Sequence, residues 1–297
     1  MGKRRKKHEE SLSRMTRPQS QWRDVLHRLF RNKLAVVGLV IVVVILFCVI
    51  FADFITPYDY AEQDYSARFQ YPSLAHPFGT DNFGRDLFAR VLYGGRVSLL
   101  VALLSILISL VIGSFLGATA GYFGGKYEVA VMRVMDVVMA IPGLLLAVAI
   151  SAGLGTGIFN TALAISIASI PPTVRMLRAT VLQIRDEEYV EAARATGSGN
   201  LRIIFRHIFP NTVAPLIVDS TLRIGMNILQ ISSLSFVGLG IQPPTPEWGS
   251  ILSSGQAYIQ DFWPILVFPG LAIMITLLGF NLLGDGLRDA LDPRLKQ

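Results

Sequence analysis

This chain has little charge and a single cysteine, and both shortages exclude classes of protein. Asp, Glu, Lys and Arg make up 16% of its 297 residues, well below the roughly 25% usual in soluble domains. The one cysteine, Cys48, allows no internal disulfide and no thiolate metal cluster, so it does not indicate a redox compartment. With 52% hydrophobic residues, the composition instead predicts an integral membrane protein.

A nucleotide-binding loop is also missing. Gly125 and Lys126 look like the end of a phosphate-binding loop, but Ala120 stands where the first glycine is required. Tyr127 replaces the serine or threonine that would hold magnesium. We therefore expect the chain to bind neither ATP and Mg nor any other cofactor or metal.

The sequence argues against an intramembrane protease, the enzyme class that remains. An aspartyl protease needs two facing carboxylates, and the candidates Asp136 and Asp219 each have an arginine close by that would keep the carboxylate ionised. A serine protease needs a histidine in a span, whereas all 4 histidines lie outside the apolar runs. We therefore expect no catalytic residue and no enzyme activity in this chain.

The net charge of +6 suggests a nucleic-acid partner only at first sight. Many of the basic residues fall between Lys3 and Lys33, before the first apolar run. Such a cluster is typical of an anchor on the cytoplasmic face of a membrane, so we expect contact with the lipid bilayer and not with nucleic acid.

Six apolar runs predict an all-α fold of six transmembrane helices. The predicted spans are residues 34–55, 97–120, 129–152 (interrupted by Pro142), 158–177, 212–240 and 264–284. They divide the chain into a basic N-terminal tail (1–33), a first span (34–55), an extracytoplasmic loop (56–96), a five-helix core (97–284) and a C-terminal tail (285–297). In the second span Gly113, Gly117 and Gly121 are four apart, which predicts close packing on another helix.

The distribution of Lys and Arg predicts the orientation. Several arginines lie between the fourth and fifth spans, and none lies between Gln242 and Trp263. By the positive-inside rule, we expect both termini to be cytoplasmic and Arg68 and Trp248 to be outside. The predicted orientation places three arginines outside, contrary to the rule: Arg85, Arg90 and Arg96. We expect their segment to lie along the membrane interface as an amphipathic helix.

Inside the third span, Arg133 and Asp136 are three residues apart. Charged groups in a span are costly and usually functional, but an i, i+3 pair can neutralise itself. We expect a structural ion pair between these two side chains, with a functional role as the alternative.

Residues 186–210 form a polar insertion whose pattern predicts two short helices. Asp186 is the expected N-cap of the first helix, Asn200 of the second, and Pro210 is the expected end of the second. In the first helix, one face is expected to hold Tyr189, Ala192, Ala193 and Thr196. In the second helix, an apolar face is expected to hold Leu201, Ile204, Phe205 and Ile208. Gly197 lies at the joint, where a left-handed backbone is predicted.

Within this insertion, Glu191, Ala192 and Ala193, then Gly197 and an ending at Pro210, resemble the EAA loop of ABC importer permeases. His207 and Phe209 depart from the general pattern, which has isoleucine and leucine there, and His207 instead resembles the peptide and nickel branch. The resemblance implies that the loop docks on ATPase subunits. The residues it assigns to coupling are Glu188, Tyr189, Glu191, Ala192, Ala193, Gly197, Phe205, His207, Phe209 and Pro210.

Two further segments, residues 78–98 and 284–294, resemble the C-type permease subunits of dipeptide, oligopeptide and nickel ABC importers. This resemblance implies the type I permease fold and a role as one permease of an ATP-driven importer, most simply for dipeptides or oligopeptides. Nickel, glutathione or another small solute is the alternative substrate. The implied partners are a homologous second permease, two ABC ATPase subunits that bind ATP and Mg, and an extracytoplasmic substrate-binding protein. A free-standing secondary transporter should show an internal repeat, and the sequence has none.

The fifth span carries a polar stripe. Asp219, Arg223, Asn227 and Gln230 follow one another at four, four and three residues and so share one side of a helix. Facing lipid, this stripe would be costly. We expect Asn227 and Gln230 to line the translocation path, with Asp219 and Arg223 paired near its inner end; hydrogen bonding between helices is the alternative.

Overall fold

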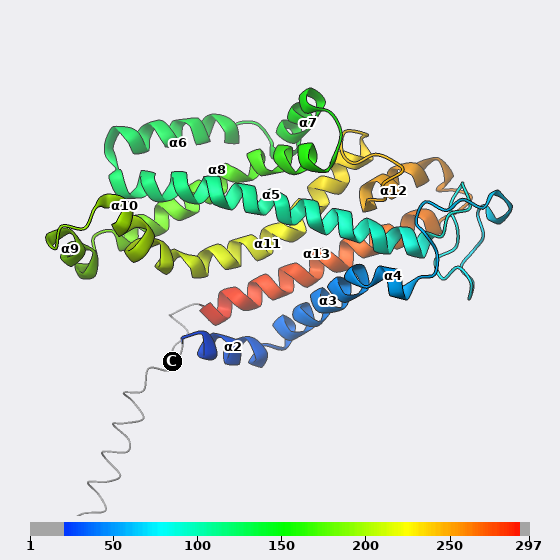
Figure 1. Ribbon diagram of the computed structural model, residues 1–297, viewed down its shortest axis with the longest axis horizontal. Helices are drawn as coiled ribbons and strands as arrows, with labels where there is room; N and C mark the ends of the chain where they lie inside the picture. The colour runs from blue at the N-terminus through cyan, green and yellow to red at the C-terminus, as the bar shows by residue number, and fades with distance from the viewer. Residues whose placement is uncertain (1–20, 292–297) are drawn as a thin grey trace, which may run out of the picture.

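The structure, a computed structural model, describes residues 21–291, which fold into helices without a β-strand (Figure 1). The long helices are α3 (Lys33–Ile50), α5 (Leu87–Phe123), α6 (Gly125–Met139), α7 (Gly143–Leu154), α8 (Ile158–Ile184), α11 (Phe209–Phe236) and α13 (Pro264–Leu291). The shorter ones are α2 (Gln21–Arg31), α4 (Ala52–Ile55), α9 (Glu188–Ala195), α10 (Asn200–Ile203) and α12 (Trp248–Gly255). The expected all-α architecture is confirmed.

Apart from α7, the long helices lie side by side along the long axis of the molecule. α9 and α10 lie at one end with α2, whereas α4 and α12 lie at the other, as Figure 1 shows. α5 and α8 make the most extensive contact between helices, and α13 packs on both α3 and α11. Opposite ends of the bundle therefore carry the 186–210 insertion and the predicted outer loops.

Four helical segments of the described chain are long and apolar enough to cross a membrane. They are Lys33–Ile50, Leu87–Phe123, Asn200–Phe236 and Pro264–Leu291, and the bent pair α6 and α7 would make a fifth. α8 is less apolar because it carries hydroxyls and Pro171 and Pro172, which lie within a 27-residue helix. At 1.5 Å per residue α8 is about 40 Å long, enough to cross a hydrocarbon core of about 30 Å.

The glycines of α5 pack closely on α8, as predicted. A Cβ atom at Gly113 would lie 2.8 Å from Thr173 Cβ, and one at Gly117 would lie 2.7 Å from the carbonyl oxygen of Val174. At Gly121 the nearest atom would be Val181 Cβ, at 2.9 Å. These separations are below van der Waals contact, so the absence of side chains is what allows the two helices to approach.

α5 begins before the predicted span, which is a correction. The helix starts at Leu87, because the Asp86 side chain caps it by accepting from the Ala89 amide at 2.6 Å. Arg90 and Arg96 are therefore helical and do not lie along the interface as an amphipathic segment. Protein groups neutralise them: Arg90 is buried 3.6 Å from Asp81.

Arg96 is held at the end of the first span. Its guanidinium lies 2.6 Å from a carboxylate oxygen of Asp53, and it also donates to the carbonyl oxygen of Val49. Arg85 is likewise paired with Asp81, at 2.7 Å. These ion pairs give a physical reason why three arginines can lie at the end opposite α9 and α10.

The third predicted span is two helices, α6 and α7, that meet at 86°. Pro142 is the N-cap of α7, at the break. The expected pair of Arg133 with Asp136 is wrong: Asp136 pairs with Arg175 of α8 at 2.5 Å. Packing of α6 on α8 brings a partner from another helix to this carboxylate.

In the segment between α11 and α13, the start of α12 is buried. Trp248 lies in the core, and its indole nitrogen donates to the carbonyl oxygen of Val91 at 2.8 Å. The buried carboxylate of Glu247 accepts from Ser98 of α5 at 2.9 Å and caps α12 through the amide of Ser250. α12 is thereby fixed between other helices.

Candidate functional site

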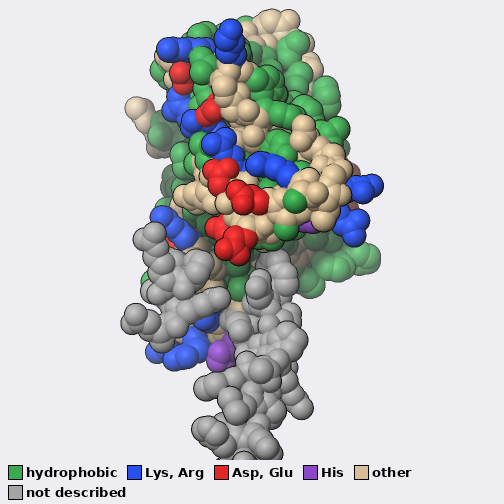
Figure 2. Space-filling view, turned by 90° about the vertical axis from the view of Figure 1, so that its left-hand side faces the viewer, with side chains coloured by type: hydrophobic (Ala, Val, Ile, Leu, Met, Phe, Trp, Pro, Cys, Tyr) green, Lys and Arg blue, Asp and Glu red, His purple; other side chains and the backbone are tan. Residues whose placement is uncertain are grey.

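The 186–210 insertion forms the end of the molecule seen in Figure 2. Asp and Glu side chains gather there, with Lys and Arg around them. Asp186, Glu187, Glu188 and Glu191 are all exposed on this segment. The insertion thus offers a charged surface at one tip of the bundle.

The inner face of the insertion is packed against the long helices. Its buried side chains are Val190, Ala193, Ile203, Ile204 and Ile208, and they share one apolar cluster with Ala118 and Tyr122 of α5, Leu177 and Val181 of α8 and Leu216 of α11. Each large aliphatic side chain buried here contributes roughly 1.5–3 kcal/mol relative to exposure. A displacement of this insertion therefore acts directly on α5, α8 and α11.

The outer face presents apolar side chains. Tyr189 is 44% exposed, Leu201 59% and Phe205 51%. Of the four residues expected on one face of the first helix, only Ala193 is buried, and Val190 takes the inward place that the pattern did not assign. Apolar side chains exposed in this way are typical of a surface that meets a partner.

Polar contacts between the insertion and its surroundings add to this packing. The Tyr122 hydroxyl donates to Asn200 Oδ1 at 3.1 Å, and the Arg194 guanidinium lies 5.2 Å from the centre of the same ring. Asn211 donates to the Tyr189 hydroxyl at 3.1 Å. The pKa of Tyr189 is raised, first by burial and then by Glu187, so its hydroxyl stays protonated.

The expected helix caps differ from those observed. Glu187 is the N-cap of α9 and Gly199 that of α10, where Asp186 and Asn200 were predicted. Asn200 Oδ1 is engaged with Tyr122 instead. The predicted backbone of Gly197 is confirmed, with φ at +80°.

Pro210 does not end the second helix, which is a further correction. α10 continues through a π-helical turn, Ile204–Ile208, directly into α11. Proline removes one backbone donor but does not break the helix here. The Asn211 side chain also donates to the carbonyl oxygen of His207, at 2.8 Å. The second helix of the insertion and the fifth span are therefore one continuous element.

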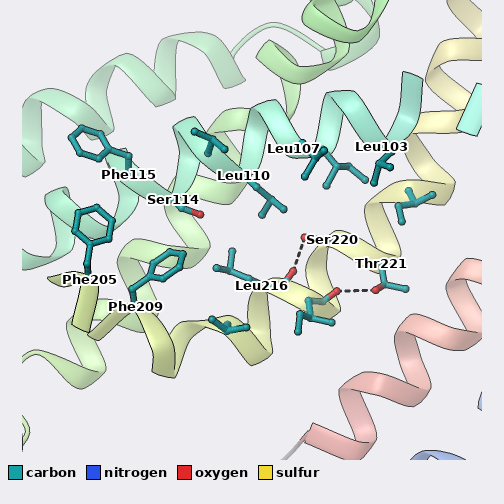
Figure 3. Close-up of a pocket in the computed structure, with 15 residues that line it drawn as sticks. Leu103, Leu107, Leu110, Ser114, Phe115, Phe205, Phe209, Leu216, Ser220 and Thr221 are labelled. Atoms are coloured by element: carbon teal, nitrogen blue, oxygen red, sulfur yellow. Dashed lines mark hydrogen bonds between the residues drawn. The ribbon is translucent and has the colours of Figure 1, made fainter. Parts of the chain in front are cut away.

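An apolar groove of about 690 Å³ lies between α5 and α11 (Figure 3). From α5 it is lined by Leu103, Ile106, Leu107, Leu110, Val111, Ser114 and Phe115. The opposite wall is Phe205, Phe209, Val213, Leu216, Ile217, Ser220, Thr221 and Ile224. Phe205 belongs to the insertion, so the groove and the insertion share a residue.

The groove offers few hydrogen-bond donors. The Ser220 hydroxyl donates to the Leu216 carbonyl at 2.6 Å and the Thr221 hydroxyl to the Ile217 carbonyl at 2.8 Å (Figure 3). These two hydroxyls are therefore used within α11, and the third hydroxyl of the lining is that of Ser114. The walls can accept apolar side chains without holding a polar solute tightly.

The polar stripe of the fifth span does not line this groove. Asp219 and Arg223 form the expected ion pair, at 2.6 Å. Asn227 is 2% exposed and donates to Ser105 Oγ of α5 at 2.8 Å, which is a contact between helices. Gln230 is half-buried. A role for these four residues in the translocation path stays a prediction.

Comparison with known families matches most of the chain, in two segments. Residues 113–297 match the family described as "Binding-protein-dependent transport system inner membrane component". Residues 20–75 match "N-terminal TM domain of oligopeptide transport permease C".

The chain is also similar to individual proteins. It is 49% identical over 286 residues to the dipeptide transport system permease protein DppC of Escherichia coli strain K12, covering 94% of this chain and 95% of that protein. Identity is 47% over 278 residues to DppC of Alkalihalophilus pseudofirmus, with 93% and 91% covered. The glutathione transport system permease protein GsiD of Escherichia coli O6:K15:H31 is 44% identical over 277 residues, again with 93% and 91% covered.

Among solved structures, a chain of the MetNI methionine ABC transporter in an inward-facing crystal form has the same fold. The TM-score is 0.56 at 18% identity, and the match covers 68% of this chain and 97% of that one. The two chains therefore share their architecture.

Proposed function

Because this chain belongs to the family of binding-protein-dependent transport system inner membrane components, and is thus a multi-pass permease subunit of an ABC importer, we propose that it imports dipeptides or oligopeptides. The relatives named as dipeptide permeases support this substrate class. The permease is not an enzyme, and ATP and Mg are bound by its partners.

Four partners complete the proposed transporter: a homologous second permease, two ABC ATPase subunits and an extracytoplasmic substrate-binding protein. The exposed apolar and acidic face of α9 and α10 is the ATPase-binding surface, with Tyr189, Glu191 and Leu201 in contact. This places the insertion and both termini in the cytoplasm and α12 toward the outside of a bacterial cell membrane.

The proposed coupling between the ATPases and the groove rests on one observation, the continuity of α10 with α11. Helix α10, the π-helical turn and α11 form one element, and Phe205 and Phe209 line the inner end of the groove. A movement of the ATPases that displaces α10 therefore also moves one wall of the groove. ATP binding and hydrolysis thus change the width of the groove.

The groove between α5 and α11 is the part of the translocation path that this subunit supplies, and the second permease closes its open side. An apolar wall with three hydroxyls, two of them engaged within α11, holds a peptide weakly, and weak binding allows release. Selection among peptides then falls to the binding protein.

Uptake by the reconstituted five-component transporter tests this function. Proteoliposomes with internal ATP and external binding protein should accumulate a labelled dipeptide, and removing ATP should abolish the accumulation. Failure of ATPase subunits to co-purify with the chain would contradict the proposal.

Glutathione is the second candidate substrate, since GsiD is almost as similar as the dipeptide permeases. Competition distinguishes the candidates in the same vesicles. Excess unlabelled dipeptide should suppress uptake, whereas glutathione and Ni²⁺ should leave it unchanged. Accumulation of labelled glutathione without accumulation of labelled dipeptide would transfer the assignment to that tripeptide.

A further inference from the structure

Helix α2 lies outside the transport machinery described above, and its two sides differ. Leu29 is buried against Ala35 and Ala290, with Val25 and Leu287 packed beside it. On other sides of the helix, Leu26 is 52% exposed and Phe30 59%. α2 is therefore tied to α3 and α13 by one face and leaves a pair of large apolar side chains uncovered.

This uncovered pair continues the exposed apolar surface of the first span. Leu26 and Phe30 are four residues apart on α2, and Leu34, at the start of α3, is also exposed. The surface then runs along α3 through exposed valines such as Val37 and Val44. Since α3 is a membrane span, this stripe faces lipid, and α2 extends it past the end of the hydrocarbon core.

Basic residues lie where the stripe leaves the span. Arg31 and Lys33 are exposed, and Arg28 is half-buried in the last turn of α2. Asn32, between α2 and α3, has an extended backbone, and in Figure 1 α2 turns off the line of α3. Its side chain also donates to Asp289 of α13, at 3.4 Å.

We propose that α2 is a binding surface for anionic phospholipid in the membrane leaflet nearest the 186–210 insertion. Leu26 and Phe30 enter the boundary between headgroups and acyl chains, and Arg28, Arg31 and Lys33 bind the phosphate groups. A helix with apolar residues on one side and Arg or Lys beside them is typical of the membrane interface, and anionic lipids are attracted to such positions. The inference goes beyond peptide import and requires only that α3 spans a membrane.

Quenching by brominated lipid measures this contact directly. The assembled transporter with Cys48→Ala and Leu26→Cys, labelled with a fluorophore at position 26, is placed in nanodiscs of phosphatidylcholine and phosphatidylglycerol. Only one of the two lipids is brominated at a time, at equal mole fraction. Brominated phosphatidylglycerol should quench the label about twofold more strongly than brominated phosphatidylcholine.

Two comparisons make the result specific. Adding Arg28→Gln, Arg31→Gln and Lys33→Gln should reduce the ratio to about one, since the attraction of basic groups to the anionic surface is lost. A label at Val44, in the middle of α3, should be quenched equally by both lipids in both backgrounds and reports that the complex is intact.

Three results would overturn the proposal. Equal quenching of the position 26 label by both lipids in the unaltered helix would mean that α2 does not select anionic lipid. Absence of quenching by either lipid would mean that protein covers this face. Preference for phosphatidylglycerol that survives the triple substitution would remove the basic residues from the contact.

Discussion

Gly197 is the residue on which the shape of the 186–210 insertion depends most directly. Its φ of +80° ends α9, and no atom lies within 4 Å of a Cβ built there. A side chain at this position is therefore penalised through the backbone and not through a clash. Only glycine adopts this conformation without a cost of about 1 kcal/mol or more.

We expect Gly197→Val to uncouple the transporter. The β-branched side chain disfavours the left-handed backbone and tilts α10 relative to α9, so peptide-stimulated ATP hydrolysis should fall while the complex still assembles. Gly199→Val is the matched control, because Gly199 has φ at −66° and also has open space around it. Equal hydrolysis and uptake by both variants would remove this joint from the mechanism.

Single residues differed in how well the sequence alone predicted them. Gly197 was predicted because a glycine after a short amphipathic stretch is a local signal. The partner of Asp136 was not, since Arg175 is far away in the chain and meets it only when α6 packs on α8. Val190 was missed because α9 is too short for its spacing to show which face is buried.

Among the elements, the α5 and α8 pair depends on its glycines. At Gly117 a Cβ atom would lie 2.7 Å from a backbone oxygen, which no side-chain rotation can relieve. Gly117→Val should therefore separate the helices and cost about 1–3 kcal/mol, which is the range for overpacked cores. The thermal unfolding midpoint of the purified permease should fall.

Gly270→Val supplies the comparison for this prediction. Gly270 is also helical, in α13, but a Cβ atom there has nothing within 4 Å. Gly270→Val therefore changes helix propensity in the same way as Gly117→Val but introduces no steric clash. If both variants unfold at the same temperature, close approach at Gly117 does not hold the pair together.

Helix existence was predicted better than helix length. Each predicted span corresponds to a helix or a bent pair, because long apolar runs are a strong signal. α5 was expected ten residues too late, since Arg90 and Arg96 look like loop residues until their buried partners are known. Pro210 was taken as an end because a π-helical turn has no sequence signal of its own.

For the whole molecule, orientation in the membrane is the broadest prediction. Cysteines placed at Arg68 and Asn200, each with Cys48→Ala, lie at opposite ends of the bundle and are both exposed. In intact cells an impermeant thiol reagent should modify position 68 and leave position 200 protected. The reverse labelling pattern would invert the orientation and place the insertion outside, away from any ATPase.

The groove could not be predicted from the sequence. Its α5 wall comes from a run in which nearly every residue is apolar, so no periodicity distinguishes the groove side from the lipid side. The polar stripe of α11 was the visible signal, and of its residues Asn227 meets Ser105 of α5. Only packing of α5 beside α11 creates the hollow.

Blocking the groove chemically tests most directly whether it is the path. Ile217 lines it, whereas Leu229 is exposed on the same helix outside it. In proteoliposomes of the complete transporter with Cys48→Ala, a small water-soluble thiol reagent should stop dipeptide uptake by Ile217→Cys. Uptake by Leu229→Cys should continue under the same treatment. If Ile217→Cys is fully modified and still transports at its untreated rate, peptides do not pass between α5 and α11.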